Sequence, residues 1–427
     1  MQVPESNSKI AVIGSGISGM SAAWFLSQKH EVTLYEKNAR LGGHTHTVDI
    51  ELNQQSCSVD TGFIVFNEPN YPLLTAMLKH LEVDTHPTEM SFAVSIDQGL
   101  LEYAGSNLST LFAQRKNLFS WQHWHMLKEI LRFNRLAKND LELGLNPELT
   151  LGSYLQQNNF GEAMQNHYLL PMAAAIWSCP TATMLKFPAN SFLQFFYNHG
   201  LLNISERPQW RTVAQGARRY LHAIESLNSF NIHYSEVVQV WAAETQNDQV
   251  RITSQDGDMR FYDRVVFACH ADEAHHLLRN QGFDLLHHFK YQHNEAWLHT
   301  DAKLMPKLKK AWSAWNYLSD ADPQQQREVA VTYWMNRLQP LPLEQDVFVT
   351  LNRQPDPSTV LKRIDYQHPV FDRDAIAAQA NLHQIQGRKN CWFAGSYCGY
   401  GFHEDGLASA AHLAQLWQIA LPWELEQ

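Results

Sequence analysis

The sequence has few cysteines, and they do not form the patterns that a disulfide framework or a zinc site requires. Its 427 residues include five cysteines, and no two of them form a Cys-x-x-Cys pair. No apolar run approaches the roughly 20 residues that a membrane-spanning helix needs. The polar start of the chain, residues 1–8, lacks the cationic and apolar regions of a secretion signal. We therefore expect a reduced, cytoplasmic protein.

Positive charge is also scarce. The chain has 33 Lys and Arg against 43 Asp and Glu, so its formal net charge is −10 with histidine neutral. Non-specific nucleic-acid binding depends on positive charge, so we expect no nucleic-acid partner. Aromatic residues are abundant, with 13 Trp, 15 Tyr and 21 Phe. Rings on this scale either fill a large core or line an apolar ligand pocket.

A glycine-rich turn between two expected strands is the strongest local signal. Residues 9–13 and 31–36 have the pattern of parallel strands, and Gly14-Ser15-Gly16-Ile17-Ser18-Gly19 opens a helix between them. The first glycine permits a tight turn, the second lets the backbone approach a pyrophosphate, and the third lets helix and sheet pack closely. Glu36 can accept the ribose hydroxyls and would repel a 2′-phosphate, which disfavours NADP. This motif alone does not distinguish NAD from FAD.

The residues that follow the second strand favour FAD. Glu36-Lys37-Asn38-Ala39-Arg40-Leu41-Gly42-Gly43-His44-Thr45 resembles the signature of the superfamily of flavin amine oxidases, protoporphyrinogen oxidases and carotenoid desaturases. In that family the arginine and the glycine pair run beside the flavin. The local chemistry agrees, because Arg40 can offset phosphate charge and two glycines leave room for a flat ring. His44 departs from the pattern, since the family usually has a second arginine there.

Two further stretches resemble the same superfamily. Val237 and Val238 begin the strand that, in the family, contacts adenine through backbone groups. Near the end of the sequence, residues 390–396 resemble the terminal flavoprotein strand, although Ser396 replaces the usual acid. The helix that begins at His403 would point its N-terminus at the flavin, where its dipole stabilises negative charge on the reduced ring.

The resemblance implies FAD as the cofactor and no metal. The residues expected to bind FAD are Gly14, Ser15, Gly16, Ile17, Ser18, Gly19, Glu36, Lys37, Arg40, Gly42, Gly43, His44, Thr45, Val237, Val238, Gly395, Ser396, Asp405, Gly406 and Leu407. The paired histidines elsewhere in the chain lack metal-ligand spacing.

Five residues are candidates for catalysis. Amine oxidases of this superfamily often place a lysine near the reactive flavin nitrogen, and Lys303 lies in the corresponding region, although the lysine-rich segment 303–310 fits a solvated face equally well. The candidates for proton transfer are His299, Asp301, His403 and Glu404. Each of these four could equally be a structural hydrogen-bonding group.

The motifs predict an α/β fold, α+β overall. We expect a Rossmann-like FAD-binding domain of the glutathione-reductase-2 type with an inserted substrate domain of helices and an antiparallel sheet. The FAD-binding domain is expected to combine residues 9–66, 205–282 and 385–420, and the substrate-binding domain residues 67–204 and 283–384. Many of the aromatic rings fall in the first insertion, so core filling and an aromatic-lined pocket are about equally favoured.

At finer grain the chain resembles one bacterial and plant branch of the superfamily. The segments that carry this likeness are Arg207-Pro208-Gln209-Trp210-Arg211, Leu298-His299-Thr300-Asp301 and residues 395–406. Its members are commonly found beside cyclopropane-fatty-acid-synthase-like methyltransferases, and some resemble furan fatty acid desaturases.

This finer resemblance implies an FAD-dependent oxidoreductase that removes hydride from a hydrophobic substrate. It would desaturate or oxidise a fatty acyl chain, which could carry a methyl branch. A flavin amine oxidase and a non-catalytic flavin-binding partner of a lipid methyltransferase are the alternatives. The resemblance also leaves open a methyltransferase partner and peripheral contact with the inner face of the membrane.

Overall fold

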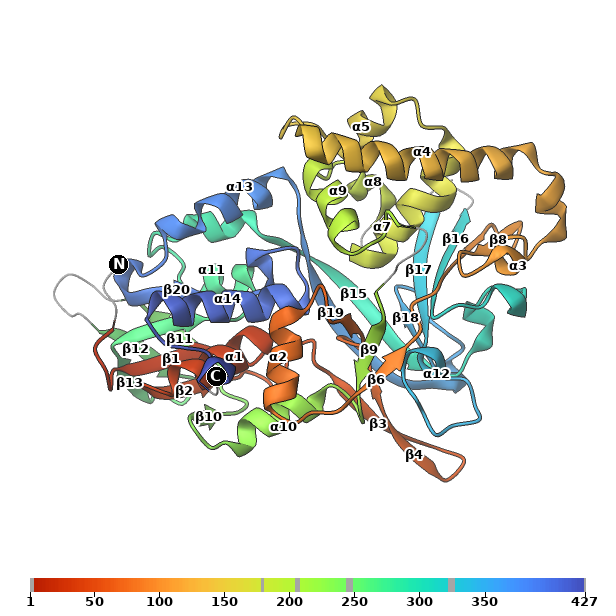
Figure 1. Ribbon diagram of the computed structural model, residues 1–427. Coiled ribbons are helices and arrows are strands. Elements are labelled where there is room, and N and C mark those ends of the chain that lie inside the picture. Colours follow the sequence, from red (N-terminus) through yellow and green to blue (C-terminus); the bar gives the residue numbers. More distant parts are fainter. Residues whose placement is uncertain (1–3, 178–179, 204–207, 243–248, 322–326, 426–427) are drawn as a thin grey trace.

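The computed structural model describes residues 4–177, 180–203, 208–242, 249–321 and 327–425. Cys179, Arg207 and the expected domain boundary between residues 204 and 205 lie outside these ranges. Figure 1 shows two lobes, one built on a parallel sheet and the other on an antiparallel sheet with helices above it. The parallel-sheet lobe contains both β1 (Lys9–Ile13) and α14 (His403–Leu416), which come from opposite ends of the sequence.

A five-stranded parallel sheet forms the centre of the first lobe. Its strands lie in the order β10 (Asn231–His233), β2 (Glu31–Tyr35), β1, β14 (Arg264–Phe267) and β20 (Cys391–Phe393). Strands β1, β2, β14 and β20 are short and mostly apolar, as expected where both faces of a parallel sheet are covered. One face carries α1 (Ile17–Leu26), α2 (Pro72–His80), α10 (Arg218–Ser226) and α14. The other face carries β11 (Val238–Trp241), β12 (Val250–Ser254), β13 (Met259–Tyr262), α11 (Ala271–Leu277) and α13 (Arg373–Asn381).

Helix α13 packs on the parallel sheet, although the sequence pattern assigns residues 283–384 to the substrate domain. Ala375 and Ala378 are buried in the same apolar cluster as Val265 and Phe267 of β14. The pattern of an amphipathic helix shows which of its faces is buried, but it does not show which sheet that face covers.

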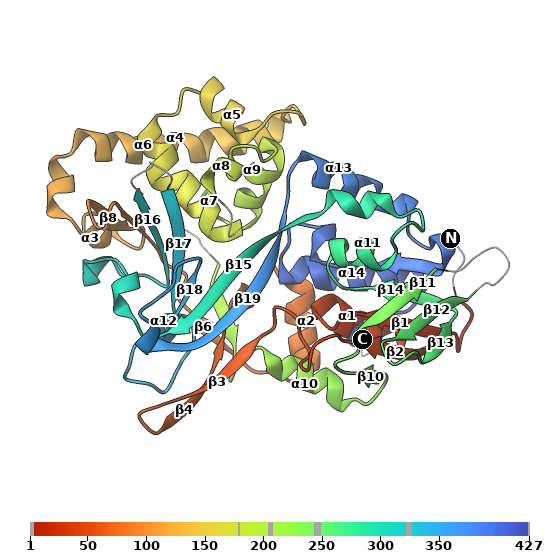
Figure 2. The ribbon, with the colours of Figure 1, turned by 180° about the vertical axis from the view of Figure 1, so that it is seen from behind.

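A seven-stranded sheet forms the second lobe. Its strands lie in the order β19 (Val360–Val370), β15 (Lys290–His299), β18 (Phe348–Leu351), β17 (Arg327–Trp334), β16 (Trp315–Ala321), β7 (Phe92–Ile96) and β8 (Leu101–Ala104). Neighbouring strands are antiparallel except for the parallel pair β16 and β7. Figure 2 shows that the long strands β15 and β19 reach from this lobe towards the parallel-sheet lobe. They therefore bring one end of the seven-stranded sheet to the junction of the lobes.

A layer of helices covers one side of the seven-stranded sheet. It contains α4 (Trp121–Leu143), α5 (Leu151–Gln157), α6 (Glu162–Met164), α7 (Leu170–Trp177), α8 (Thr181–Met184) and α9 (Ala189–Asn198). Their buried residues share a cluster with Val94 of β7 and Tyr317 of β16. Short α3 (Leu108–Leu111) precedes α4 at the outer end of this layer.

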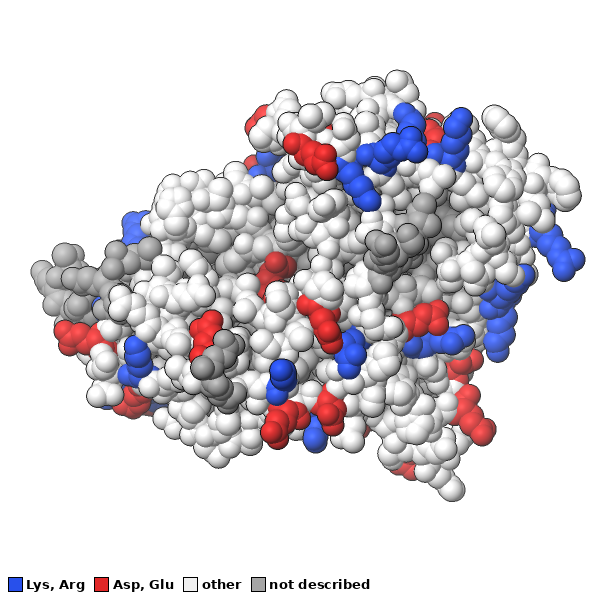
Figure 3. All heavy atoms as spheres, in the orientation of Figure 1, with Lys and Arg blue, Asp and Glu red and all other residues white. Residues whose placement is uncertain are grey.

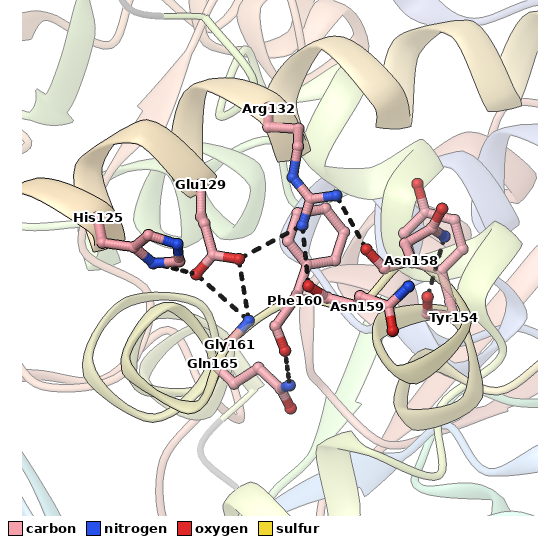
Figure 4. A network of polar contacts seen from close by, with 9 residues as sticks. All are labelled: His125, Glu129, Arg132, Tyr154, Asn158, Asn159, Phe160, Gly161 and Gln165. Carbon is pink, nitrogen blue, oxygen red and sulfur yellow. Dashed lines mark hydrogen bonds and ion pairs between the residues drawn. The ribbon is translucent and has the colours of Figure 1, made fainter. Parts of the chain in front are cut away.

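A buried carboxylate joins α4 to the loop before α6, as Figure 4 shows. The Gly161 N–H donates to Glu129 at 3.0 Å, and Arg132 lies 3.3 Å from the same carboxylate. The Arg132 guanidinium also covers the Phe160 ring at 4.1 Å and donates to the Asn158 carbonyl. These contacts hold the middle of α4 in a fixed position on the lobe.

Small elements connect the two lobes. They are the hairpin β3 (Thr47–Leu52) and β4 (Gln55–Asp60), the sheet β5 (Phe66–Asn67), β9 (Trp210–Val213) and β6 (Thr85–Thr88), and α12 (Met335–Leu338). Asp60 is fully buried where they meet, and it accepts hydrogen bonds from the Ala217 N–H, the Thr47 hydroxyl and the Gln339 amide. Burial raises the pKa of Asp60 to about 7.

Candidate functional site

A cavity of about 1060 Å³ lies where the two lobes meet. Gly14, Glu36, Ala268 and Gly395 line it, and each lies just beyond the carboxyl end of a strand of the parallel sheet. Ligands of open α/β sheets bind at such strand ends. The opposite wall comes from the antiparallel sheet and the helical layer. The glycine turn and these elements of the other lobe therefore line the same cavity.

The glycine turn has the geometry that an anion site needs. Gly14 has φ +97°, and a Cβ at Gly19 would lie 1.8 Å from the Gly14 carbonyl oxygen, so both positions exclude a side chain. Gly16 differs, because a Cβ there would meet no atom within 4 Å and would project into open space at the cavity wall. Gly16 is also the N-cap of α1 and makes no side-chain capping hydrogen bond, which suits a helix N-terminus that binds an anion.

Glu36 is held at the end of β2 by several donors. Ser15 donates to one carboxylate oxygen through its N–H, at 3.1 Å, and through its hydroxyl. Asn38 donates to the other oxygen through its N–H and its side-chain amide, at 2.8 and 2.7 Å. Glu36 is therefore a fixed acceptor beside the glycine turn. Its neighbour Lys37 forms an ion pair with Glu273 of α11.

His44, at the position where the family pattern has an arginine, lies in a cluster of aromatic and histidine rings. The His44 ring stacks on Tyr366 at 4.9 Å and lies 5.2 Å from the ring of His368 and 6.0 Å from that of His270. Burial holds the pKa of His44 well below its usual range, and it lowers the pKa of His368 to about 4. His44 and His368 are therefore neutral hydrogen-bonding groups at neutral pH.

Several polar atoms on the cavity wall fit a bound cofactor. Within the part of the chain that the structure describes, these atoms are buried without a hydrogen-bond partner on the cofactor side of the cavity: His44 Nε2, His270 Nδ1 and Tyr397 Oη. Buried polar groups are normally paired, so orphaned ones that line a cavity indicate a ligand with its own donors and acceptors. A flavin with its ribityl and phosphate groups has both.

Most residues expected to bind FAD line this cavity. Those in the lining are Gly14, Ser15, Gly16, Ile17, Ser18, Glu36, Lys37, Arg40, Gly42, Gly43, His44, Val237, Val238, Gly395 and Ser396. Those behind the lining are Gly19, Thr45, Asp405, Gly406 and Leu407. Thr45 bonds the Tyr220 hydroxyl, and the Asp405 carboxylate accepts the Phe402 N–H at the start of α14. A Cβ at Gly406 would lie 2.8 Å from Ile17, so that glycine lets α14 pack on α1.

His403 lines the cavity, unlike the other four catalytic candidates. Its ring stacks on Phe63 at 3.8 Å, and its Nε2 lies 2.8 Å from the Tyr220 hydroxyl. Burial lowers the pKa of His403 to about 3. His403 is therefore a neutral hydrogen-bonding group at neutral pH, placed at the first residue of α14.

The positions of Glu404 and Lys303 do not support their expected catalytic roles. Glu404 accepts the N–H groups of Leu73 and Leu74, at 2.8 and 3.0 Å, and thereby caps α2. Lys303 has an 81% exposed side chain, and its ammonium lies 3.8 Å from Asp356. Glu404 is thus satisfied within the protein, and Lys303 belongs to the solvated face that the sequence left open.

His299 and Asp301 also have structural partners in place of a reacting atom. His299 is fully buried in the seven-stranded sheet, where its Nε2 lies 2.7 Å from the Thr350 hydroxyl and its Nδ1 accepts the Asp301 N–H. The Asp301 carboxylate accepts the N–H groups of Lys303 and Asp356. The two residues therefore shape the turn after β15 and do not line the cavity.

The opposite end of the cavity is apolar and aromatic. The residues that form it are Met90, Ile176, Trp177, Phe195, Leu201, Trp210, Trp315, Tyr333 and Leu351. The Phe195 ring lies 4.6 Å from Trp177 and stacks on Phe402 at 4.9 Å, which connects the helical layer to the start of α14. No Lys, Asp or Glu is among these nine. Sequence reasoning anticipated rings from the first insertion, but not those from strands β9, β16 and β17.

The parallel sheet with its glycine turn and the cavity between the lobes fit a flavin-dependent oxidoreductase. Residues 17–336 match the family model for flavin containing amine oxidoreductases, so the chain belongs to that family. The family resemblance, the FAD cofactor and the oxidoreductase class inferred from the sequence are thereby confirmed. Among the described helices, none has the length and apolar character needed to cross a membrane.

Solved structures of other proteins have the same fold. One is the CLA-producing fatty acid isomerase from P. acnes, with a TM-score of 0.68, 14% identity, and coverage of 97% of this chain and 99% of the other. Another is wild-type putrescine oxidase bound to putrescine, with a TM-score of 0.63, 13% identity, and coverage of 96% and 99%. These likenesses confirm the α/β fold class expected from the sequence.

Proposed function

We propose that this FAD-dependent oxidoreductase desaturates or oxidises a fatty acyl chain, and that methyl-branched acyl chains are its best substrates. The observation that carries this proposal is the uncharged aromatic end of the cavity, described above. Burial of each methylene against such a wall contributes about 0.8 kcal/mol, so an acyl segment of six buried methylenes would gain about 5 kcal/mol. The sequence resemblance to fatty-acid-modifying relatives points the same way.

The absence of a carboxylate from the nine apolar lining residues disfavours an amine substrate. An ammonium group buried there would lose its hydration without gaining an opposite charge. His199 does not change this, because burial lowers its pKa to about 4 and keeps it neutral. The acids that line the cavity are Glu36 and Glu236 beside the parallel sheet, Asp272 and Glu273 of α11, and Asp365 of β19.

The roles of the chain's own residues follow from their positions. When bound, FAD would supply the hydride acceptor, and oxygen or a carrier would take up the electrons. Trp177 and Phe195 would hold the acyl chain and exclude water from it. His403, which is neutral and hydrogen-bonded to Tyr220, would help to position the bound cofactor at the N-terminus of α14.

A substrate panel tests the proposal. We expect a methylated monounsaturated acyl lipid to bleach the flavin under anaerobic conditions and to give a product two mass units lighter. Ile176→Asp, which places a charge on the apolar wall, should raise the KM for that lipid more than tenfold. The control Leu143→Asp alters a side chain that is 77% exposed at the far end of α4 and should leave KM unchanged.

Two other outcomes would refute the proposal. Peroxide release with polyamines or monoamines, without any reaction of lipids, would identify an amine oxidase. A bound flavin that no lipid or amine reduces would identify a non-catalytic partner protein, and such a protein would be expected to co-purify with a methyltransferase.

A further inference from the structure

We propose that one end of the lobe that holds the seven-stranded sheet docks on the surface of an anionic lipid bilayer. We call this region the basic aromatic end, and it consists of residues 100–131 and 303–310. The proposal concerns a surface and not the cavity, so it does not rest on the proposed substrate. It can be tested without any turnover.

The first observation is a local reversal of charge. Residues 103–128 contain Arg115, Lys116 and Lys128 but no Asp or Glu. Residues 302–319 contain four lysines and likewise no acid. The basic aromatic end as a whole has seven Lys and Arg and two acids, a net charge of +5, so the rest of the chain carries −15 for the total of −10. Positive charge is thus concentrated at one place in an acidic protein.

The second observation is that the two basic segments lie side by side. The Glu102 carboxylate, which is buried, accepts the N–H groups of Lys307 and Leu308 at 2.7 and 2.9 Å. Lys116 donates to the Leu100 carbonyl at 2.7 Å. In Figure 3 the blue side chains gather along the edge where Figure 1 places α3 and β8. Separate stretches of sequence therefore build one surface.

The third observation is exposed aromatic and aliphatic area on the same surface. Of the 17 large apolar side chains that are exposed in the described residues, eight belong to the basic aromatic end: Leu100, Leu108, Leu118, Phe119, Trp121, Trp124, Leu131 and Leu308. Phe119 is 91% and Trp121 81% exposed. Scattered apolar residues need no explanation, but a cluster of this kind marks an interaction surface.

The exposed rings project from a fixed scaffold. The Ser120 hydroxyl caps α4 by accepting the His123 N–H, and the Trp124 indole donates to the Leu118 carbonyl at 2.9 Å. Further along the helix, the Glu129 network of Figure 4 ties α4 to Gly161. Phe119 and Trp121 therefore remain outside the protein, because the elements that carry them are already held in place.

The combination of chemistry favours a bilayer over a protein partner. Trp and Phe rings favour the interface between headgroups and acyl chains, where a polar edge and an apolar face are both satisfied. Lysines around them are attracted to anionic headgroups. The two acids within the basic aromatic end, Glu102 and Glu129, are buried and hydrogen-bonded within the protein. Lys303, paired with Asp356, contributes least of the seven cations.

Co-sedimentation of the full-length, FAD-loaded protein with vesicles tests this proposal. We expect binding to phosphatidylcholine vesicles that contain phosphatidylglycerol, weakened by salt, and little binding to phosphatidylcholine alone. Phe119→Ser with Trp121→Ser should reduce binding more than tenfold. Lys309→Glu with Lys310→Glu should reduce it by at least fivefold for each lysine lost.

Matched controls separate this surface from general effects. Leu143→Ser removes a leucine at the other end of α4 that is 77% exposed, about as much as Trp121. Lys29→Glu with Lys79→Glu makes the same change of charge as the Lys309 and Lys310 variant, but on the parallel-sheet lobe. Both should bind vesicles as the wild type does, and all variants should keep the flavin spectrum. The proposal is overturned if the wild type does not sediment with anionic vesicles, or if the controls lose binding as strongly as the test variants.

Discussion

The glycine turn allows cofactor binding to be separated from folding by a single methyl group. At Gly16 the backbone has φ −60° and ψ 179°, which any residue adopts, and a Cβ would meet no protein atom within 4 Å. Gly16→Ala should therefore fold normally. It should even stabilise the FAD-free protein, by about 0.4–1 kcal/mol, because alanine reduces the entropy of the unfolded chain.

The same methyl group should weaken FAD binding. It would occupy the space at the start of α1 where the pyrophosphate is expected to approach the backbone. Displacing the phosphate from the helix N-terminus should cost at least about 1.4 kcal/mol, which is tenfold in Kd. Titration of the FAD-free protein, followed by flavin fluorescence, measures the Kd, and urea unfolding of the same sample measures the stability.

Gly19→Ala is the matched variant. Its Cβ would lie 1.8 Å from the Gly14 carbonyl oxygen, so it should prevent the helix from packing and abolish soluble, folded protein. The reasoning would be refuted if Gly16→Ala bound FAD as tightly as the wild type, or if the FAD-free Gly16→Ala protein were clearly less stable.

Three further predictions follow from buried or exposed side chains. Because burial raises the pKa of Asp60 to about 7, from about 3.9 in the unfolded chain, the folded state binds more protons between pH 4 and 7. Asp60 therefore makes the free energy of unfolding fall as the pH rises through that window, by up to about 1.4 kcal/mol per pH unit. Asp60→Asn should lack this slope when melting curves are recorded across the window. The same pH dependence of stability in both proteins would contradict the raised pKa of Asp60. His403→Ala removes a ring stacked on Phe63 and a hydrogen-bond partner of Tyr220. Urea unfolding of the FAD-free variant should therefore show a free energy of unfolding about 2–4 kcal/mol lower than that of the wild type. A decrease below about 1 kcal/mol would mean that the site collapses around the gap. Lys303→Ala should leave kcat and KM within twofold of wild type, since the side chain is 81% exposed, whereas a tenfold loss of kcat would show that Lys303 reaches the reacting atoms.

The cofactor side of the site could be predicted because its signals are local. The turn from Gly14 to Gly19 and the acid at Glu36 lie within one βαβ unit, where spacing along the chain determines spacing in the fold. The flavin signature up to His44 continues directly from that unit. Contact of each of these residues with FAD stays a prediction, which the Gly16 variant tests first.

The substrate side could not be predicted in the same way. Trp315 and Tyr333 face the cavity because β16 and β17 pair in one register, which brings their rings within 5.0 Å. The pairing register of two strands, and the sheet face on which each ring lies, cannot be inferred reliably from the sequence of the two strands alone. Spacing along the sequence likewise does not reveal that His299 has a partner in Thr350 on the next strand and lies outside the cavity lining.

The order of strands in the parallel sheet also determines when this protein can acquire its cofactor. β1 pairs with β14, whose residues come 254 positions later in the register, and β20 and α14 come from beyond residue 390. At about 5–20 residues per second, synthesis of 427 residues takes about 20–90 s. For most of that time the strands and the helix that surround the glycine turn in the folded protein have not yet been synthesised. Such non-local pairing is slow to form and exposes sheet edges meanwhile. We therefore expect FAD to bind only after synthesis of α14, so that premature termination before residue 391 yields flavin-free, aggregation-prone chains.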